Sequence, residues 1–312
     1  MIEGTARLGR LGGLLDRADV VHAQNVMNPE ALRRLAGTGR AVVTVQDHRF
    51  FCPGQGKSLP DGSRCETALQ ETDCSWCIAD SAYRERAIQL TLARRDAIRD
   101  ARRVVLSRYM ADELCAVGLG GAAVIPPWFS VAPPKEYPGR GFVMGGRLVR
   151  HKGFELGLKA WQRAGQPHTM TVVGEGPLQG SFSNCEMPGW LGRGELAVRL
   201  RRARALVFPA VWQEPFGMIG VEALAQGTPV VVAETGGVGD WARQGVVRVP
   251  AGDVGAMADA VAALAKDGEW ARELGEQGRC MVARNFDRRT LEARLAHLYA
   301  EVVVRRMDEG VQ

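Results

Sequence analysis

Short apolar runs alternate with helical patterns along most of the chain. The apolar runs are rich in β-branched residues and bounded by glycine, proline or polar residues, as expected of strands buried on both faces of a parallel sheet. They cover Asp19–Gln24, Ala41–Gln46, Arg103–Ser107, Gly141–Gly146, Thr169–Gly174, Ala205–Ala210 and Pro229–Glu234. Helical periodicity lies between them, over Pro29–Ala36, Ala82–Asp100, Phe154–Ala164, Ile219–Gln226, Val254–Asp267 and Thr290–Arg305. The alternation predicts an α/β fold with helices on both faces of its sheets.

A proline-rich stretch without periodicity, Ala122–Gly141, divides this pattern and reads as a linker. A chain of 312 residues is long enough for two domains. We therefore expect two doubly wound domains that face a cleft. Ligands of such sheets bind outside the carboxyl ends of the strands.

Composition narrows the class of protein. A hydrophobic content of 46% supports packed cores and excludes a disordered chain. The net charge of +5 suits an anionic ligand or an acidic membrane surface without requiring either. The sequence has no apolar run long enough to span a bilayer, and its first residues lack the pattern of a signal peptide. We expect a cytoplasmic protein, whose cysteines are thiols or metal ligands rather than disulfides.

Two glycine-rich turns follow predicted strands. Gly145 and Gly146 end one strand and precede Arg147, Lys152 and a helix, an arrangement that offers backbone N–H groups and two positive charges to a diphosphate. Taken alone, this pattern is more often a basic surface loop. The turn at Gly174 is a weaker signal, because α/β proteins contain many such turns.

Two carboxylates frame the apolar stretch EPFGMIGVE. Glu214 lies in a predicted loop and Glu222 in the first turns of the next helix, so both belong at the strand ends. Carboxylates accept hydrogen bonds from paired hydroxyls of ribose or a hexose. The backbone over Phe216, Gly217, Met218 and Ile219 offers N–H groups to a phosphate. The alternative is a solvated loop acid and a glutamate that satisfies a helix dipole.

The order of GRLVRHKG, VVGEGP and FPAVWQEPFGMIGVEALAQGTPVVVAETGG resembles the nucleotide-sugar half of retaining GT-B-fold glycosyltransferases of family four (glycosyl transferases group 1). The resemblance implies that Arg147 and Lys152 hold the donor diphosphate. It implies that Glu214 contacts the transferred sugar and that Glu222 binds the ribose. By the same resemblance Trp190 and Leu191 lie at the nucleobase.

The resemblance also implies the domain plan and the reaction. We expect a shortened acceptor-side Rossmann-like domain over 1–128, a donor domain over 129–285, and a helix over 286–312 that returns to the first domain. The expected reaction moves a hexose from a nucleotide-diphosphate sugar to a hydroxyl of a sugar or lipid-linked acceptor, with retention. No catalytic metal is expected, since the sequence lacks an Asp-x-Asp pair and the diphosphate has cationic side chains.

The first half departs from the family pattern. Where the family shows His-Asp after a strand, this chain has Gln46 and Asp47 followed by His48, so Asp47 and His48 are candidate catalytic residues. Few residues precede the first predicted strand, which implies a truncated sheet with an exposed edge. We expect a homodimer or a partner chain at this edge, or a start codon placed too late.

Four cysteines lie in a polar loop over 52–77. Cys52, Cys65, Cys74 and Cys77 include one C-x2-C pair, and four thiolates of this kind can enclose a structural zinc ion. An iron–sulfur cluster, a redox pair at Cys74 and Cys77, or free thiols are the alternatives. Some members of the family carry a similar insertion, which favours a structural role.

An arginine-rich helix follows this loop, and such a run is usually a solvated face. Peripheral contact with an anionic membrane is the less favoured interpretation. Nucleic acid is not expected, because no binding motif accompanies the charge. The alternative to an enzyme is a non-catalytic nucleotide-sugar-binding subunit whose partner supplies the acceptor half. An epimerase or a phosphorylase of the same fold is disfavoured by the Glu214–Glu222 element and by the lack of a cofactor-lysine motif.

Overall fold

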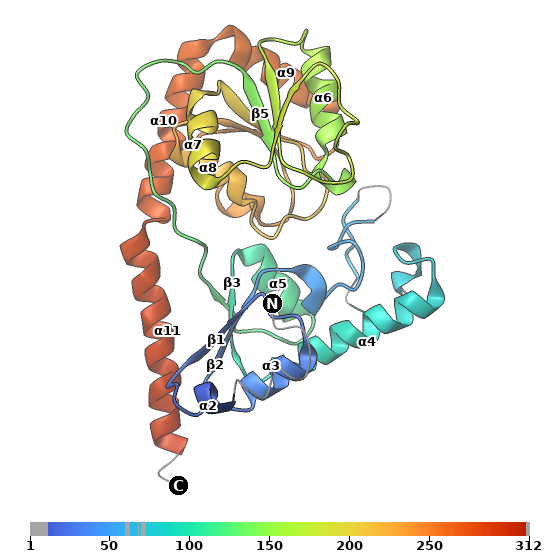
Figure 1. Ribbon diagram of the computed structural model, residues 1–312, viewed down its shortest axis with the longest axis vertical. Helices are drawn as coiled ribbons and strands as arrows, with labels where there is room; N and C mark the ends of the chain where they lie inside the picture. The colour runs from blue at the N-terminus through green and yellow to red at the C-terminus, as the bar shows by residue number, and fades with distance from the viewer. Residues whose placement is uncertain (1–11, 60–62, 68, 70–72, 310–312) are drawn as a thin grey trace. The chain divides into compact units, whose positions relative to one another are not determined.

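The computed structural model describes residues 12–59, 63–67, 69 and 73–309. The chain forms two compact units (Figure 1). Unit 1 comprises Met1–Pro127 and Arg289–Gln312, and unit 2 comprises Trp128–Arg288. The sequence predicted divisions after residues 128 and 285. Every helix in the described part of the chain is too short or too polar to cross a bilayer.

Unit 1 is built on a four-stranded parallel sheet in the order β1-β2-β3-β4. Its strands are β1 (Val21–Gln24), β2 (Ala41–Val45), β3 (Arg102–Val105) and β4 (Ala123–Val124). Its helices are α2 (Gly12–Leu15), α3 (Pro29–Ala36), α4 (Ser81–Ala97), α5 (Arg108–Ala116) and α11 (Arg288–Glu309), with 3-10 turns η2 (His48–Phe50) and η3 (Asp73–Trp76). The sequence pattern missed β4, which lies inside the predicted linker, and α5.

The C-terminal helix α11 packs on the sheet of unit 1, although the whole of unit 2 lies between them in sequence (Figure 1). Leu298 and Val302 form a buried cluster with Val42 of β2. The His22 ring lies between Tyr299 Oη and a β2 hydroxyl, with a Nδ1–Oη distance of 2.6 Å. The opposite face of the sheet is buried against α3, α4 and α5.

Several arginines of α4 and its neighbourhood serve the fold. The buried Arg94 donates from Nε to the Met27 carbonyl at 2.8 Å. Arg103 donates to the Ile98 carbonyl at 2.9 Å and to the Gly120 carbonyl at 2.8 Å. Part of the basic run is therefore committed to holding backbone carbonyls within unit 1.

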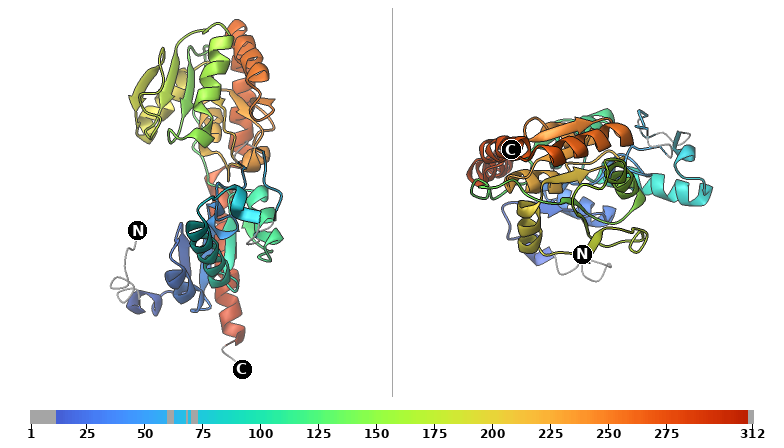
Figure 2. Two further views of the ribbon diagram at one scale, coloured as in Figure 1. Left: turned by 90° about the vertical axis from the view of Figure 1, so that its right-hand side faces the viewer. Right: turned by 90° about the horizontal axis from the view of Figure 1, so that it is seen from above.

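Unit 2 contains a six-stranded sheet in the order β10-β9-β8-β5-β6-β7, whose neighbouring strands run parallel. The strands are β5 (Phe142–Gly145), β6 (Met170–Val173), β7 (Glu186–Gly189), β8 (Ala205–Phe208), β9 (Val230–Ala233) and β10 (Val246–Val249). The helices are α6 (Phe154–Arg163), α7 (Arg193–Arg202), α8 (Met218–Ala225), α9 (Val254–Lys266) and α10 (Gly268–Asn285), with 3-10 turns η4 (Arg150–Lys152) and η5 (Gly236–Asp240). Helix α6 packs against α9 on one face of the sheet, and α8 packs against α7 and α10 on the other (Figures 1 and 2).

The pattern missed β7, β10, α7 and α10 in this unit. Strand β7 is a half-exposed edge strand that contains a proline, so it lacks the buried β-branched signature. Helix α10 contains Gly275 and Gly278, which lower helix propensity. A Cβ at Gly275 would lie 2.2 Å from the Gly227 carbonyl oxygen, and one at Gly278 would lie 2.5 Å from Leu224. Close packing therefore requires the same glycines that lower the helix propensity and prevent the prediction of α10 from the sequence.

The segment before β5 is tied to unit 2 by a partly buried lysine. Lys135 Nζ donates to Thr228 Oγ1 at 2.6 Å and to the Ala203 carbonyl at 3.1 Å. Burial, with a smaller contribution from the charges of Arg201 and Arg204, lowers the pKa of Lys135 to about 7. The folded chain therefore releases this proton at a lower pH than the unfolded chain does.

We expect the free energy of unfolding to rise between pH 7 and about pH 10 through Lys135. The unfolded lysine binds a proton over this window and the folded one does not, and stability rises with pH wherever the unfolded state binds more protons. The measurement is urea unfolding at several pH values for the wild type and Lys135→Met. The variant should lack part of this rise, whereas Lys159→Met, at an exposed lysine of α6, should retain it. Parallel curves for wild type and Lys135→Met would contradict the assignment.

Candidate functional site

The strand order of unit 2 reverses between β5 and β8. From β5 the chain first builds outward to β6 and β7, and then returns to place β8 on the other side of β5. In an open parallel sheet such a reversal leaves a crevice outside the carboxyl ends of the two strands, where ligands bind. The loops that follow β5 and β8 carry Arg147, Lys152 and Glu214, the main candidates from the sequence.

The β5 loop reaches the β8 loop through a glycine. Gly153, between η4 and α6, has a φ of 72°, and a Cβ there would lie 1.9 Å from the carbonyl oxygen of Pro209. In addition, the N–H groups of Val211 and Trp212 donate to the His151 carbonyl at 3.1 and 3.3 Å. The two loops are thereby held in direct backbone contact, and the side chains they carry are brought to one place.

A buried ion pair joins the same two loops. Lys152 Nζ donates to Glu214 Oε1, and the side chains are 18% and 4% exposed. Lys152 Nζ also lies 4.8 Å from the centre of the Trp212 ring, within the range of a cation–π interaction. The lysine is thus fixed by a carboxylate and an aromatic face, and it carries its positive charge at the switch point of the sheet.

His151 stands between these cations and a tryptophan. Its ring centre lies 4.5 Å from that of Trp212. Burial, followed by the charges of Lys152 and Arg147, lowers the pKa of His151 to about 4. The imidazole is therefore neutral near pH 7, and its Nε2 is a buried atom without a hydrogen-bond partner among the described residues. Arg147 is exposed and is available to a ligand.

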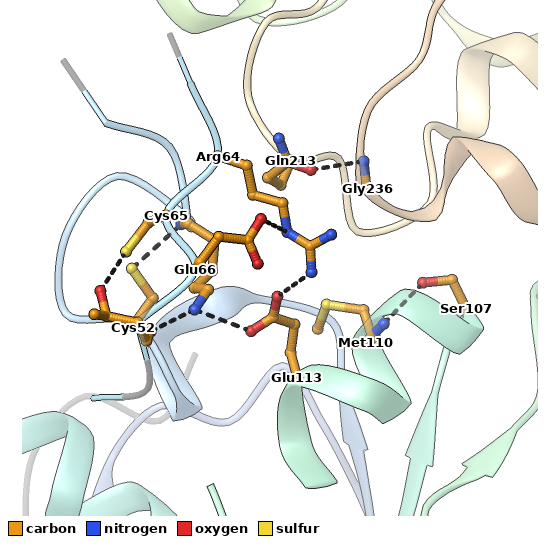
Figure 3. A network of polar contacts seen from close by, with 11 residues as sticks. Cys52, Arg64, Cys65, Glu66, Ser107, Met110, Glu113, Gln213 and Gly236 are labelled. Atoms are coloured by element: carbon orange, nitrogen blue, oxygen red, sulfur yellow. Dashed lines mark hydrogen bonds and ion pairs between the residues drawn. The ribbon is translucent and has the colours of Figure 1, made fainter. Parts of the chain in front are cut away.

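The loop after β9 supports Glu214 from a third strand. The Gly236 N–H donates to Gln213 Oε1 at 2.9 Å, as Figure 3 shows. The Gly237 N–H donates to the Glu214 carbonyl at 2.7 Å. A Cβ at Gly236 would lie 2.4 Å from the Glu214 carbonyl oxygen, so the β9 loop packs directly on the backbone of the acid. Three loops therefore determine the position of one carboxylate.

The apolar residues between the two acids pack the start of α8. Gly217, with a φ of 82°, precedes the helix, and Trp241 Nε1 donates to the Phe216 carbonyl at 2.5 Å. Phe216 is 1% exposed. A Cβ at Gly145 would lie 2.3 Å from Ile219 Cδ1, so that glycine lets α8 approach the end of β5. Met218 is 43% exposed at the beginning of the helix.

Glu222 lies one turn further along α8. Burial raises the pKa of this carboxyl, and the charge of Arg193 at the start of α7 partly offsets the effect. An acid with a raised pKa and a nearby arginine is poised to accept hydrogen bonds from a ligand, because its ionised form gains the most from new donors.

A second set of candidate residues lies at the ends of β6 and β7, on the side of β5 away from β8. Gly174 follows β6, and a Cβ there would lie 1.9 Å from the Gly146 carbonyl oxygen, so two glycines allow the β5 and β6 turns to touch. After β7, Trp190 is 66% exposed and Leu191 is half-buried. An exposed tryptophan at a strand end offers a flat apolar face to a ring.

The candidates of unit 1 lie after β2. Asp47 accepts hydrogen bonds from the Arg49 N–H at 2.9 Å and from Arg49 Nε at 2.8 Å. Burial acts to raise the pKa of Asp47, but these bonds and the Arg49 charge outweigh it and the net shift is downward. His48 is 2% exposed and packs edge-on against Phe51 and near Tyr109. Asp47 is therefore ionised and partly accessible, whereas His48 is enclosed by aromatic rings.

Sequence reasoning overlooked His151 and Trp212, and it gave Gly153 no structural role beyond preceding a helix. His151 and Trp212 flank Arg147, Lys152 and Glu214 in the quoted motifs, but nothing in the one-dimensional pattern says that their rings meet. Gly153 follows Lys152 directly, and a glycine between a basic turn and a helix is a recognisable sign of a positive φ. The contact with Pro209 that makes it indispensable is tertiary.

Residues 138–281 match the family model of the glycosyl transferases group 1. The chain is 31% identical over 169 residues to a glycogen synthase of Mycobacterium tuberculosis, a match that covers 49% of this chain and 41% of that protein. It is 27% identical over 245 residues to an uncharacterized glycosyltransferase of Bacillus subtilis (YqgM), covering 72% of this chain and 66% of that protein. The chain thus covers less than two thirds of either relative.

Solved structures share the fold. The HepE protein of Anabaena, crystallised in complex with UDP-glucose, superposes with a TM-score of 0.70 at 16% identity, covering 94% of this chain and 82% of that one. A sucrose-phosphate synthase of Thermosynechococcus elongatus gives a TM-score of 0.65 at 20% identity, covering 96% and 77%. The two parallel sheets are those of the GT-B glycosyltransferases. The match to the family model of the glycosyl transferases group 1 lies within unit 2.

We expect Gly153→Ala to destabilise unit 2 by more than the about 1–2 kcal/mol that a positive φ alone costs a side chain. The new Cβ must displace the Pro209 carbonyl, and with it the β8 loop. The matched control is Gly165→Ala, where φ is 84° and nothing lies within 4 Å of the added atom. Urea unfolding measures both variants. Equal losses would show that the contact between the two loops contributes nothing.

Proposed function

We propose that this chain transfers a sugar from a nucleoside-diphosphate donor to a hydroxyl acceptor, with retention of configuration. The observation that carries the proposal is the Lys152–Glu214 pair at the β5/β8 switch point, beside the exposed Arg147. In this pair the lysine is suited to neutralise a leaving diphosphate, and the carboxylate is suited to bind the hydroxyls of the transferred sugar.

The donor diphosphate would be bound by side chains and backbone together. Arg147 and Lys152 supply two positive charges, and the N–H groups at Gly217, Met218 and Ile219 lie at the start of α8. Charge that develops on the leaving diphosphate is stabilised by these fixed donors, which need no reorganisation during the reaction. Catalysis in this proposal is independent of a metal ion, because the cationic side chains perform the neutralisation.

The transferred hexose would contact Glu214. This carboxylate is 3% exposed and is oriented by Lys152, so it is suited to accept hydrogen bonds from sugar hydroxyls. Its pairing with lysine leaves it a poor nucleophile. We infer that it positions the donor, and that the acceptor hydroxyl attacks on the face from which the diphosphate departs.

The nucleoside would lie along α8 and the end of β7. Glu222 would accept hydrogen bonds from the two ribose hydroxyls. The exposed ring of Trp190, with Leu191, would pack against the base. On the acceptor side, Asp47 is the ionised group that could orient a hydroxyl of a sugar or of a lipid-linked glycan. His48, enclosed by Phe51 and Tyr109, would act through the position of this loop rather than by contact.

The first experiment is calorimetry with UDP-, GDP- and ADP-sugars, followed by an assay of nucleotide release with and without simple acceptors. Binding accompanied by release and sugar transfer supports the enzyme. Binding without transfer to any acceptor favours the alternative, a donor-binding subunit whose acceptor half comes from another chain. Failure to bind any nucleotide sugar would overturn both.

We expect Glu222→Gln to weaken nucleotide-sugar binding about tenfold or more, as for a lost charged hydrogen bond of roughly 1.5–3 kcal/mol. Because the pKa of Glu222 is raised by burial, wild-type affinity should fall as the pH decreases toward that pKa and the ribose acceptor becomes protonated. The variant should be insensitive to pH in this range. Calorimetry between pH 5 and pH 8 measures both effects, with Glu269→Gln on α10 as the exposed control. Unchanged affinity in Glu222→Gln would exclude the ribose assignment.

We expect Lys152→Met to lose both stability and transfer, because it leaves Glu214 buried without its partner, at a cost of about 3–5 kcal/mol. The double variant Lys152→Met, Glu214→Gln should recover much of the stability but none of the transfer. The free energy of unfolding and the rate of nucleotide release are measured for the two single variants and the double. A double variant that also recovers transfer would show that the pair is structural only.

A further inference from the structure

Two parts of unit 1 carry charged side chains that the proposed reaction does not use. The first is the loop over 52–77, where Lys57 and Arg64 pair with Glu113 of α5 at 3.3 and 3.1 Å. Within the described part of the chain no group of three or more His, Cys, Asp or Glu side chains could hold a metal ion, and none of the four cysteines of this loop is in a disulfide. The second part is a basic groove beside the C-terminal helix.

The groove lies between the edge strand β4 and α11, and its volume is about 680 Å³. Its floor is apolar, because Ala123 and Ile125 pack beside the buried Leu298 in the cluster that holds α11 on the sheet. A hollow of this size is within the range of small-molecule sites, roughly 300–1,000 Å³. Every residue that lines the groove belongs to unit 1, so the groove is formed within one unit.

Four arginines line this groove, and they are held in different ways. Arg103 is fixed in the wall, because it donates to four backbone carbonyls at 2.6–2.9 Å. Arg294 donates from Nη2 to the Val124 carbonyl of β4 at 2.6 Å. Arg102 and Arg289 are exposed. The groove therefore combines two charges whose positions the backbone sets with two side chains that can turn toward a ligand.

One carboxylate partly neutralises these charges. Glu301 Oε2 lies 3.5 Å from Arg102 Nη2, and Glu301 Oε1 lies 3.3 Å from His297 Nε2. The Arg102 and Glu301 side chains are 44% and 41% exposed, and a pair of this kind contributes little to stability. Four arginines and one carboxylate leave the lining with a net charge of +3 when the histidine is neutral. Positive charge gathered in a concave surface attracts anions.

The geometry favours a small anion over a peptide or a membrane. An added peptide strand would need the outer edge of β4. The Ile125 N–H points to β3, so the Val124 carbonyl of the same peptide points outward, where Arg294 already occupies it. A membrane contact would need apolar side chains that project from the surface, whereas those of the groove form its floor. Guanidinium groups pair with phosphate oxygens through two parallel hydrogen bonds.

We propose that this groove binds a small phosphate-bearing ligand. Arg102 and Arg289 contact the phosphate oxygens, while the fixed guanidinium groups of Arg103 and Arg294 contribute positive charge. Glu301 releases Arg102 as the ligand binds, so this carboxylate is an internal competitor of the phosphate.

The position of the groove gives such a ligand a structural effect. One wall is the last strand of unit 1 before the chain leaves it after Pro127, and the other wall is the helix on which the chain returns at Arg289. A ligand between them would hold these two segments together and stabilise α11 on the sheet. The site lies in unit 1 and does not rest on the proposed sugar transfer.

The test is hydrogen–deuterium exchange of the full chain with inorganic pyrophosphate as the probe, followed by peptide mass analysis. We expect slower exchange in peptides over 121–125 and 289–301. Arg289→Gln should require an about tenfold or higher pyrophosphate concentration for the same protection, as for a lost charged hydrogen bond. Glu301→Gln should require less, because it removes the competing carboxylate. Arg34→Gln, at an exposed arginine of α3, is the matched control and should behave as the wild type.

The readout separates this site from the donor site of unit 2. Pyrophosphate bound at Arg147 would slow exchange only in peptides of unit 2, and Arg147→Gln should leave the protection of the groove unchanged. Groove peptides whose exchange pyrophosphate does not alter would overturn the proposal, whether or not the chain transfers sugar. So would protection that is identical in Arg289→Gln, Glu301→Gln and the wild type. Protection by phosphatidylglycerol vesicles but not by pyrophosphate would assign the groove to a membrane surface instead.

Discussion

The arrangement of unit 2 at its switch point depends on the ion pair between Lys152 and Glu214. Neither charge is stable alone in such a buried place, since an isolated carboxylate there would take up a proton or unfold its surroundings. The lysine belongs to the loop after β5 and the glutamate to the loop after β8. Their ion pair therefore holds the carboxyl ends of these two strands together. A stabilising interaction and a candidate binding feature are in this way the same pair of atoms.

Glycines make this pairing sterically feasible. Gly153 allows the β5 loop to meet the Pro209 carbonyl, Gly174 allows the β6 turn to meet Gly146, and Gly236 allows the β9 loop to meet Glu214. Each of these contacts would be blocked by a single Cβ. The apolar residues between the two acids have a different task, because Phe216 and Ile219 hold the start of α8 against Trp241 and the end of β5. The residues between the two acids thus form packed support at the carboxyl edge of the sheet.

Unit 1 uses a similar device with other residues. Glu113 of α5 is 6% exposed and is paired with Lys57 and Arg64, which approach it from the two arms of the cysteine loop. The Lys57–Glu113 pair is largely removed from water and is therefore screened less than a surface pair, whereas Arg64 is 47% exposed. In each unit a buried carboxylate is paired with a cation from a different segment, Glu214 with Lys152 and Glu113 with Lys57, and the pair fixes a loop after a strand of the parallel sheet.

The sequence by itself determined the α/β class, most of the central strands and helices, and the identity of the donor-site candidates. This was feasible because buried parallel strands are continuous β-branched runs, and because glycines and cations after strands have a direct chemical meaning. The sequence did not predict the edge strands β4 and β7, because their residues are partly exposed and lack a continuous apolar run. It did not predict helix α10, because the glycines that its close packing requires lower the helix propensity. Tertiary structure alone decided the partner of Lys152, the position of the Trp212 ring, the enclosure of His48, and the pairing of Glu113 with Lys57 and Arg64. Each of these contacts joins positions far apart in the chain and leaves no periodic trace in the sequence.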